Sequence, residues 1–506
     1  MKVIFTFLFV CIVSLAFGTT YYISPTGSDT NPGTINNPFF TLNKAWSVVS
    51  AGDIIYLRGG TYRFNSQQKL SGKNGTVNDT IKIFAYPGER PVLSKSATYV
   101  TPGWPQSLIY LQGNYTWWKG IEIAGYTQAT AVIWYAMALR LSNNNRIEQL
   151  NSHHNGHGLV IRDGSSNNLV LNSDFHHNYD PMSSYGDGDG IEIAYHVSSA
   201  TNTMRGCRMW NNADDGLDLW DNNGNMIVDN CWAWNNGYRE DGVTQGGDGG
   251  GFKFGKTTTE NGTEFKRTFT NCIAVYNRLR GFNQNAANVK FHFYNNIAYQ
   301  NKSKGIEFYS YDLAHIVRNN ICFENPTNWS GAHYNAIIDH NSNDGSWQTT
   351  GPVASAADFI SLDTAGISGP RKPDGSLPYI NFMHLAEESD LIDAGVDVGL
   401  PYFGSAPDIG AFERNPNTSV ISAGNKHNLT IYPNPARNFI TVSISEDSSE
   451  PQSIRIYNLL GELCLEKTLD RDAINQVQIN FKPGLYIVQL RKGSSIVDVQ
   501  KLNVIL

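Results

Sequence analysis

Charged residues are scarce in this chain of 506 residues, and this limits the classes of protein to which it can belong. Asp, Glu, Lys and Arg make up only 16% of the sequence, whereas aromatic residues make up 12% and there are 47 glycines. Few charges and many glycines argue against long helices, and the aromatic content argues against disorder, so an all-β chain is favoured. The net charge is −7 and no basic run stands out, so we expect no nucleic-acid partner.

Paired cysteines and long apolar runs are also lacking. Of the six cysteines, Cys11 lies in an N-terminal apolar segment, and the remaining five form no CxxC pair. A disulfide framework and a zinc site are therefore disfavoured, and small buried thiols are expected. The apolar run from Val3 to Ala16 follows Lys2 and is short for a bilayer span. We interpret residues 1–18 as a secretory signal, with an uncleaved anchor as the alternative, and expect a secreted or cell-surface protein.

An internal repeat from about residue 145 decides the predicted fold. A Ser, Cys or Asn recurs, and an Asn follows it five residues later each time. The two columns are Ser173, Cys207, Cys231, Cys272, Asn296 and Asn320, and Asn178, Asn212, Asn236, Asn277, Asn301 and Asn325. The period is 24 residues, with insertions of 10 and 17 residues in two coils. This pattern predicts a right-handed parallel β-helix with three strands per coil and about 4.8 Å between coils.

A glycine followed by an apolar–polar–apolar triplet marks a further register in the repeat. The polar middle residues are Glu192, Asp218, Lys253, Asn283 and Glu307. Because strand residues alternate between the two faces, the apolar neighbours face the interior and the polar column forms one outer wall. Both insertions fall in the coils that carry Asp189 and Lys253, so the binding cleft is expected on this side.

The remaining segments give the domain boundaries. The stretch from 20 to 62, with helical spacing at 42–50, resembles the start of many secreted right-handed parallel β-helices, which implies a short helix that caps the open end. The β-helix is expected to occupy 19–413 and to end in an irregular tail packed along it. The polar segment 414–428 is interpreted as a linker. Short alternating strands from 429 to 506 predict a small C-terminal β-sandwich.

Four carboxylates gather on the predicted outer wall: Asp189, Asp214, Asp215 and Asp218. Carboxylates this close cannot all stay charged without a cation. Oxygen ligands without His or Cys favour Ca²⁺ over zinc. Asp-Gly pairs are also common turn formers. That structural interpretation is kept for Asp187, Asp221 and Asp248.

Lys253 lies alone between two apolar residues, in the column that holds Asp218. We interpret it as a Brønsted base, with a solvated surface charge as the alternative; Lys256 falls beyond the triplet, in the turn. A base must be neutral, so burial or a nearby cation is expected to lower the pKa of Lys253. A cation beside an amine suits β-elimination in a uronic acid polymer, where the base removes the C5 proton and the 4-linked sugar leaves.

Two other polar groups have two interpretations each. Five histidines are interpreted as corner residues of the coils, with a sugar contact as the alternative: His153, His154, His157, His176 and His177. Arg278 and Arg280 lie one coil beyond Lys253, where they either bind uronate carboxylates or are solvated.

The phrases GDGDGIEIA, NNADDGLDLWDN, NCWAWNNG and GDGGGFKFG, in this order, resemble polysaccharide lyase family 9, the pectate lyases with a parallel β-helix. The resemblance covers roughly residues 20–413. It implies that Lys253 is the catalytic base and that the four aspartates bind Ca²⁺. It also implies pectin, an acidic plant cell-wall polysaccharide, as substrate. The Gly-rich GGDGGG before Phe252 departs from the family pattern.

The phrases YPNPA at 432–436 and PGLY at 483–486 are similar to the C-terminal sorting domain of type IX secretion substrates. This resemblance implies the secretion machinery as a partner.

The sequence therefore predicts a monomeric, Ca²⁺-dependent lyase that cleaves polygalacturonate by β-elimination to 4,5-unsaturated products. A rhamnogalacturonan I endolyase with the same mechanism is the first alternative. A β-helical glycoside hydrolase, which needs two carboxylates and no lysine base, is another. A non-catalytic carbohydrate-binding surface protein is the third.

Overall fold

The computed structural model describes residues 18–505 except 260–261, 310–312, 332–334, 343–349, 415–428, 445–451, 459–462, 470–474 and 493–494. The chain divides into two compact units, Met1–Asn415 and Pro416–Leu506. Apart from Gly18 and Arg414, the predicted signal and linker lie outside the described residues. None of the helices in the described part of the chain is long and apolar enough to cross a membrane.

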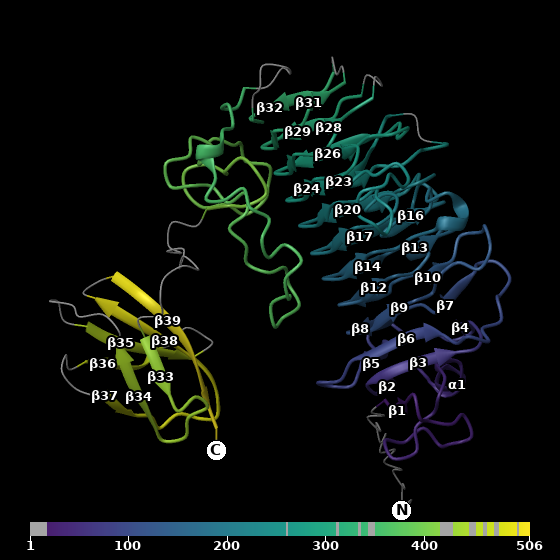
Figure 1. The fold of residues 1–506 in the computed structure, drawn as a ribbon, viewed down its shortest axis with the longest axis horizontal. Helices are drawn as coiled ribbons and strands as arrows, with labels where there is room; N and C mark the ends of the chain where they lie inside the picture. Colours follow the sequence, from purple (N-terminus) through teal and green to yellow (C-terminus); the bar gives the residue numbers. More distant parts are fainter. Residues whose placement is uncertain are drawn as a thin grey trace, which may run out of the picture. The chain divides into compact units, whose positions relative to one another are not determined.

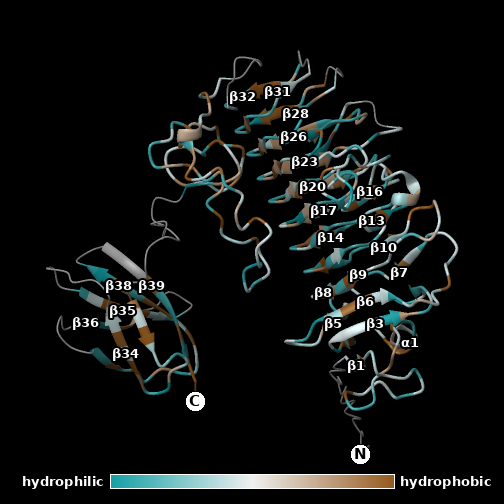
Figure 2. Cartoon of the chain, viewed as in Figure 1, coloured by the Kyte–Doolittle hydropathy of each residue, from teal (hydrophilic) through white to brown (hydrophobic). Residues whose placement is uncertain are grey.

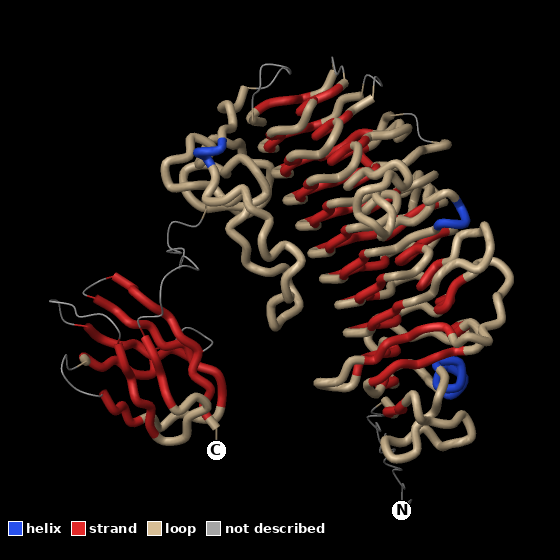
Figure 3. Tube along the Cα trace, in the orientation of Figure 1, coloured by secondary structure: helices blue, strands red, loops and turns tan. Residues whose placement is uncertain are grey.

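The first unit is a parallel β-helix of three sheets (Figures 1 and 3). The first sheet contains β1 (Thr20–Ile23), β2 (Ile54–Leu57), β5 (Ile81–Ala85), β8 (Thr116–Lys119), β11 (Arg146–Glu148), β14 (Asn168–Leu171), β17 (Thr201–Arg205), β20 (Asn225–Asp229), β23 (Phe265–Thr270), β26 (Lys290–Tyr294), β29 (Ile316–Arg318) and β32 (Ile337–Asp339). The second, here called the site sheet, contains β4 (Gln68–Leu70), β7 (Ser107–Leu111), β10 (Tyr135–Arg140), β13 (His157–Arg162), β16 (Ile191–Ala194), β19 (Leu217–Asp218), β22 (Phe252–Lys253), β25 (Arg280–Asn283), β28 (Lys304–Glu307) and β31 (Thr327–Ser330). The third contains β3 (Gly60–Phe64), β6 (Pro91–Lys95), β9 (Glu122–Ala124), β12 (Asn151–His153), β15 (Asp174–His176), β18 (Arg208–Trp210), β21 (Trp232–Trp234), β24 (Ile273–Val275), β27 (Ile297–Tyr299) and β30 (Ile321–Phe323).

Apolar side chains from every rung fill the space between the sheets. In the site sheet Ile191, Leu217 and Phe252 are fully buried and stack directly on one another. Figure 2 shows hydrophobic segments recurring from rung to rung along the stack. The predicted fold and the inward direction of the apolar triplet residues are therefore confirmed.

The second predicted column is a ladder of buried asparagine amides. Asn212 Nδ2 donates to Asn236 Oδ1 at 3.0 Å, and Asn236 Nδ2 donates to Asn277 Oδ1 at 2.9 Å. Asn236 Nδ2 also donates to the backbone carbonyl of Met209 in the preceding coil. Because these buried amides are hydrogen-bonded, the ladder holds the turn of each coil without the free-energy penalty of a buried, unpaired polar group.

The cysteines follow the predicted pattern with one exception. Cys207, Cys231, Cys272 and Cys322 are buried, and Cys207 N donates to Cys231 Sγ at 3.4 Å. Cys464 in the second unit is exposed, against the expectation of buried thiols throughout.

Helix α1 (Leu42–Val48) caps the N-terminal end of the stack, as predicted. Thr41 begins it, because its hydroxyl accepts a hydrogen bond from the backbone N–H of Lys44. Leu42, Ala45 and Trp46 face the core and are buried. The helix therefore covers apolar surface that the first coil would otherwise expose.

The segment 350–414 has almost no regular structure beyond η2 (Ala356–Asp358) and packs on the outer face of the third sheet. Phe382 and Ile409 lie in one apolar cluster with Trp232, Ile273 and Ile297. This arrangement matches the predicted tail.

The second unit consists of two antiparallel sheets. One contains β33 (Leu429–Tyr432), β34 (Phe439–Ile444) and β37 (Asn475–Gln478); the other contains β36 (Leu463–Thr468), β35 (Gln452–Asn458), β38 (Gly484–Lys492) and β39 (Ser495–Val504). Ile440 from one sheet and Val488 from the other belong to one buried cluster, so the unit has its own core.

Candidate active site

The polar column on the site sheet has the predicted register. Glu192 pairs with Asp218, Asp218 with Lys253, and Lys253 with Asn283 on successive strands. A glycine precedes each triplet because adjacent coils approach closely there. A Cβ on Gly216 would lie 2.6 Å from the carbonyl oxygen of Gly251, closer than any side chain allows.

The four predicted aspartates are brought together and buried. Asp189, Asp214 and Asp215 each place a carboxylate oxygen within 4.8 Å of the others; Asp218 is outside this group of three and is linked to Asp215 through Lys253. Backbone N–H groups hold some of these oxygens: Asp215 N donates to Asp189 Oδ1 at 2.8 Å, and Gly250 N donates to Asp215 Oδ1 at 2.5 Å. Asp215 Oδ2 and Asp218 Oδ1 are buried and accept no hydrogen bond from the described residues.

Burial and mutual repulsion disfavour the ionised form of the four carboxylates in this cluster. Burial and the neighbouring carboxylates raise the pKa of Asp189 and Asp214 well above the usual range. Burial also raises the pKa of Asp218 to about 6, although Lys253 opposes the shift. The available ligand atoms are all carboxylate oxygens; Asp218 Oδ1 is buried without a hydrogen bond, and Asp215 Oδ2 has the Lys253 ammonium 3.0 Å away. The residues present therefore fit a hard divalent cation.

Lys253 is buried against the same cluster. Its Nζ atom is 3.0 Å from Asp215 Oδ2, 3.0 Å from Asp218 Oδ2 and 3.4 Å from Asp248 Oδ2. Burial lowers the pKa of this amine, but the surrounding carboxylates, Asp215 first, raise it more, and the net direction is upward. Of the two expected causes of a lowered pKa, burial is outweighed here, and the carboxylates hold the proton on the lysine unless a nearby cation compensates their charge.

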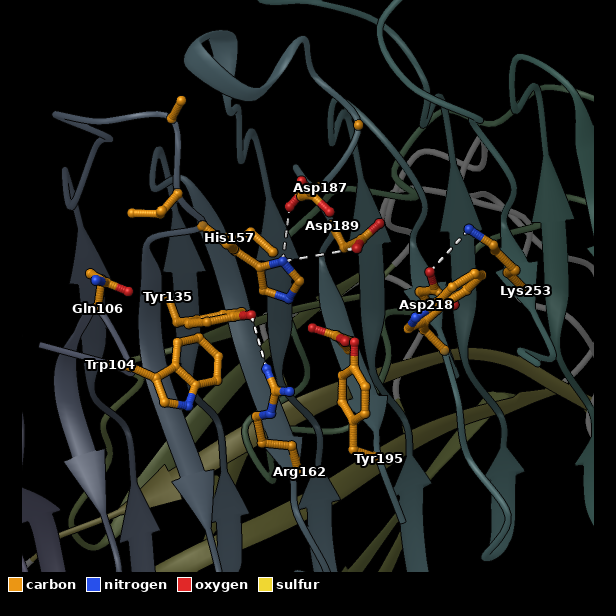
Figure 4. Close-up of a pocket in the computed structure, with 16 residues that line it drawn as sticks. Trp104, Gln106, Tyr135, His157, Arg162, Asp187, Asp189, Tyr195, Asp218 and Lys253 are labelled. Atoms are coloured by element: carbon orange, nitrogen blue, oxygen red, sulfur yellow. Dashed lines mark hydrogen bonds and ion pairs between the residues drawn. The ribbon is translucent and has the colours of Figure 1, made fainter. Parts of the chain in front are cut away.

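A cavity of about 540 Å³ opens over this part of the site sheet (Figure 4). It is lined by Trp104, Gln106, Ala131, Val132, Ile133, Tyr135, His157, Arg162, Gly186, Asp187, Asp189, Glu192, Tyr195, Asp218, Trp220 and Lys253. Asp189, Asp218 and Lys253 therefore face a space that a ligand can enter. Lys256 is not among the lining residues; it lies 5.2 Å from the centre of the Trp220 ring.

Three of the structural interpretations from the sequence require correction. His157 is no corner residue: it belongs to β13, lines the cavity, and its Nδ1 atom is 3.9 Å from Asp189 Oδ2. Asp187 lines the cavity, and Asp248 contacts Lys253. Both aspartates were interpreted only as turn residues, whereas the insertions fold their loops back over the site.

The other four histidines lie where β12 and β15 end: His153 and His176 are the last residues of these strands, and His154 and His177 follow them. His153 stacks on His176 with ring centres 4.7 Å apart, and His154 stacks on His177 at 5.1 Å.

The side chains of Arg278 and Arg280 interact with other residues of the chain. Arg278 Nη2 donates to the carbonyls of Gly247 and Asp248, and Arg280 forms an ion pair with Glu307. Neither lines the cavity. The arginine that does is Arg162, two coils before Asp218, which the sequence argument did not consider.

A parallel β-helix with a lysine and buried carboxylates in a surface cavity defines a class of extracellular carbohydrate-active enzyme. The chain belongs to the Pel9A-like, right-handed β-helix family, whose model matches residues 21–343, and residues 430–505 match the secretion system C-terminal sorting domain. It is therefore a polysaccharide lyase, and it is secreted or held at the cell surface. The predictions of family, enzyme class and location are confirmed.

Characterised relatives cover most of the first unit. Pectate lyase L of Dickeya chrysanthemi is 34% identical over 408 residues, covering 78% of this chain and 90% of the relative. Pectate lyase PEL9 of Emericella nidulans is 30% identical, covering 55% of this chain and 72% of the relative. Among solved structures, pectate lyase Pel9A has a TM-score of 0.65 at 31% identity, covering 79% and 98% of the two chains. A rhamnogalacturonan lyase has a TM-score of 0.58 at 30% identity, covering 73% and 97%.

Proposed function

We propose that the chain is a Ca²⁺-dependent lyase that cleaves the polygalacturonate backbone of pectin by β-elimination. One observation carries this proposal: the Lys253 amine lies 3.0 Å from Asp215 and Asp218 at the wall of an open cavity. A base and a carboxylate cluster that needs a cation are thus side by side where a polymer can reach both. The similarity to pectate lyases supports the choice of polymer.

In this proposal Asp189, Asp214, Asp215 and Asp218 hold the metal. Bound Ca²⁺ would neutralise the substrate carboxylate and stabilise the negative charge that develops beside C5. Lys253 takes the C5 proton. The electron pair of that C–H bond forms the C4=C5 double bond, the C4–O4 bond breaks, and the leaving oxygen takes a proton from solvent. No water is consumed in the net reaction, and the new end of the chain is 4,5-unsaturated.

Rhamnogalacturonan I is the second candidate substrate, and the cavity lining favours considering it. Glu192 and Asp187 lie on the wall beside Asp189 and Asp218, so carboxyl groups line the middle of the cavity. Burial raises the pKa of Glu192 to about 8, so near pH 7 this carboxyl is largely neutral and can donate a hydrogen bond to a hydroxyl of a neutral sugar such as rhamnose. The solved rhamnogalacturonan lyase is as similar in sequence to this chain as Pel9A is.

The test is incubation of the purified protein with each polymer, with Ca²⁺ and with a chelator. Unsaturated products that form only with Ca²⁺ are expected, and the faster polymer identifies the substrate. Saturated products that form equally well in the chelator would contradict the proposal and indicate a hydrolase.

We also propose that residues 1–18 are an export signal and that residues 429–506 engage the type IX secretion machinery. We further propose that the enzyme acts as a monomer. Size-exclusion chromatography with light scattering tests the oligomeric state. Deletion of 429–506 is expected to abolish secretion from a host with that machinery, while the first unit, which has its own core, keeps its activity.

A further inference from the structure

Arg162 lines the same cavity as Lys253 and lies between Trp104 and Tyr195, well separated from Lys253 (Figure 4). It is the last residue of β13, and three steps along the site sheet separate β13 from β22, which carries Lys253. At the spacing of stacked strands this is about 14 Å along the axis of the β-helix. A chain of several sugars is needed to reach from one cationic group to the other.

The guanidinium of Arg162 is held between two aromatic rings. Its Cζ atom is 4.5 Å from the centre of the Trp104 ring and 4.2 Å from that of Tyr195. Only 11% of the side chain is exposed. Rings on both faces fix the plane of the group, so little conformational entropy remains to be lost when a ligand binds its edge.

The edge of that plane has few partners among the described residues. Nη1 donates one long hydrogen bond, of 3.4 Å, to the Tyr135 hydroxyl. Nε is buried without a hydrogen bond, and the carboxylate nearest to it, Asp163 Oδ1, is 3.5 Å away. Asp163 is itself shared with Arg140, whose Nε contacts Oδ2 of the same carboxylate. The positive charge of Arg162 is therefore only partly compensated, although the group faces a cavity that admits solvent.

We propose that Arg162, clamped by Trp104 and Tyr195, is a binding subsite for the carboxylate of a uronate residue several sugars away from the cleaved bond. A planar guanidinium with a free edge binds a carboxylate through two parallel hydrogen bonds, which a lysine or an amide cannot reproduce. The subsite rests on the proposed lyase function, because it assumes that the bound polymer also reaches Lys253. Its role is to bind and orient the chain, while proton transfer belongs to Lys253.

The test compares Arg162→Ala with Arg140→Ala on oligogalacturonides of increasing length. Arg140 is the matched control because it pairs with Arg162 in register on β10 and with the same Asp163, but does not line the cavity. For the unaltered enzyme and for Arg140→Ala, we expect KM to fall as the oligomer becomes long enough to reach Arg162. For Arg162→Ala, that fall is lost, so KM for long oligomers rises about 10-fold or more, while kcat and the KM for short oligomers stay the same.

Two further measurements separate carboxylate recognition from a general effect on the fold. In calorimetric titrations with long oligomers, Arg162→Ala is expected to weaken binding of the native oligomer at least 10-fold and to leave binding of a carboxyl-reduced, neutral oligomer unchanged. Arg162→Lys keeps the charge without the planar fork, so it should recover only part of the affinity. Equal losses for charged and neutral oligomers, or an unchanged length dependence of KM, would overturn the subsite.

These results are distinguishable from failure of the proposed function. If the unaltered protein gives no unsaturated product but binds charged oligomers through Arg162, the subsite stands and the elimination mechanism fails. If elimination occurs and Arg162→Ala behaves like Arg140→Ala, the mechanism stands and the subsite fails.

Discussion

The Oδ2 atom of Asp218 and the Nζ atom of Lys253 are 3.0 Å apart, and the two residues are register partners on the adjacent strands β19 and β22. The proposed base and one proposed metal ligand are thus neighbours through the backbone of the sheet itself. A single ammonium cannot neutralise four buried carboxylates, so the site has excess negative charge near Lys253. The position of this charge gives the first two predictions.

Replacing Lys253 by Ala is expected to lower kcat by about 10²- to 10⁴-fold, the usual contribution of a general base. The rate of appearance of the ultraviolet absorbance of the unsaturated product measures it. Lys256→Ala is the matched control, because Lys256 also lies near the Trp220 ring but does not line the cavity. Full activity in Lys253→Ala would remove the mechanism proposed above.

Replacing Asp214 by Asn should have opposite effects on stability with and without Ca²⁺. Without the ion the variant is expected to have a higher Tm, because one of the mutually repelling buried charges is gone. With Ca²⁺ at about 100 times its Kd, the unaltered protein gains about 2.7 kcal/mol, and the variant gains less. Differential scanning calorimetry with and without Ca²⁺ measures both effects.

Asp241→Asn controls for the loss of a carboxylate, since Asp241 lies in an exposed turn outside the cluster. An Asp214→Asn protein that responds to Ca²⁺ as the unaltered protein does would show that Asp214 holds no metal.

Replacing Arg371 by Ala is expected to loosen the tail from the third sheet. Arg371 Nη2 donates to Asp174 Oδ1 at 2.7 Å, and its other contacts include the carbonyls of Ser173 and Gly206. Asp174 keeps its two hydrogen bonds to Arg208, so the expected loss is that of hydrogen bonds to a charged group, about 1.5–3 kcal/mol. Limited proteolysis should then cut within 350–414 at a lower protease concentration. Arg414→Ala is the control, because its pair with Glu387 is solvent-exposed and contributes about 0–1 kcal/mol.

Acid is expected to destabilise the first unit partly through His384. This imidazole stacks on Phe412 with ring centres 3.9 Å apart, and burial lowers its pKa to about 4. In the unfolded chain the same group takes up a proton below about pH 6.5. The unfolded state therefore binds more protons between pH 6.5 and 4, and stability falls as the pH drops through that window, by up to about 1.4 kcal/mol per pH unit.

His384→Phe keeps the stacking on Phe412 and removes the titrating group. Urea unfolding at pH 7 and pH 5 should show a smaller loss of stability for this variant than for the unaltered protein. Equal losses in the two proteins would mean that His384 does not contribute to the acid sensitivity.

The sequence predicted those parts of the fold and site that depend on the repeat. Because the period is fixed, the stacking of Asp218 on Lys253 and the chain of asparagines follow from counting residues. Arg162 was missed because it and Tyr195 lie outside the polar column that the repeat picks out, and its other partner, Trp104, comes from a segment 58 residues earlier that carries no repeat phrase. The contact of Asp248 with Lys253 was missed for a different reason: it depends on how an insertion folds, and periodicity says nothing about that.

The direction of the pKa shift of Lys253 could not be predicted from the sequence either. Burial and neighbouring charge act in opposite directions on this amine, and only distances decide between them. Counting residues showed that the carboxylates are close, but not that two of them lie at 3.0 Å.

The asparagine ladder keeps the spacing between coils independent of the length of the segments that connect their strands. Asn212 and Asn236 are 24 residues apart, Asn236 and Asn277 are 41 apart, yet the amide–amide distances are 3.0 and 2.9 Å. Seventeen extra residues thus leave the pitch of the coil unchanged. The coil that carries the longest insertion therefore keeps the same spacing between Asp218 on β19 and Lys253 on β22 as its register requires.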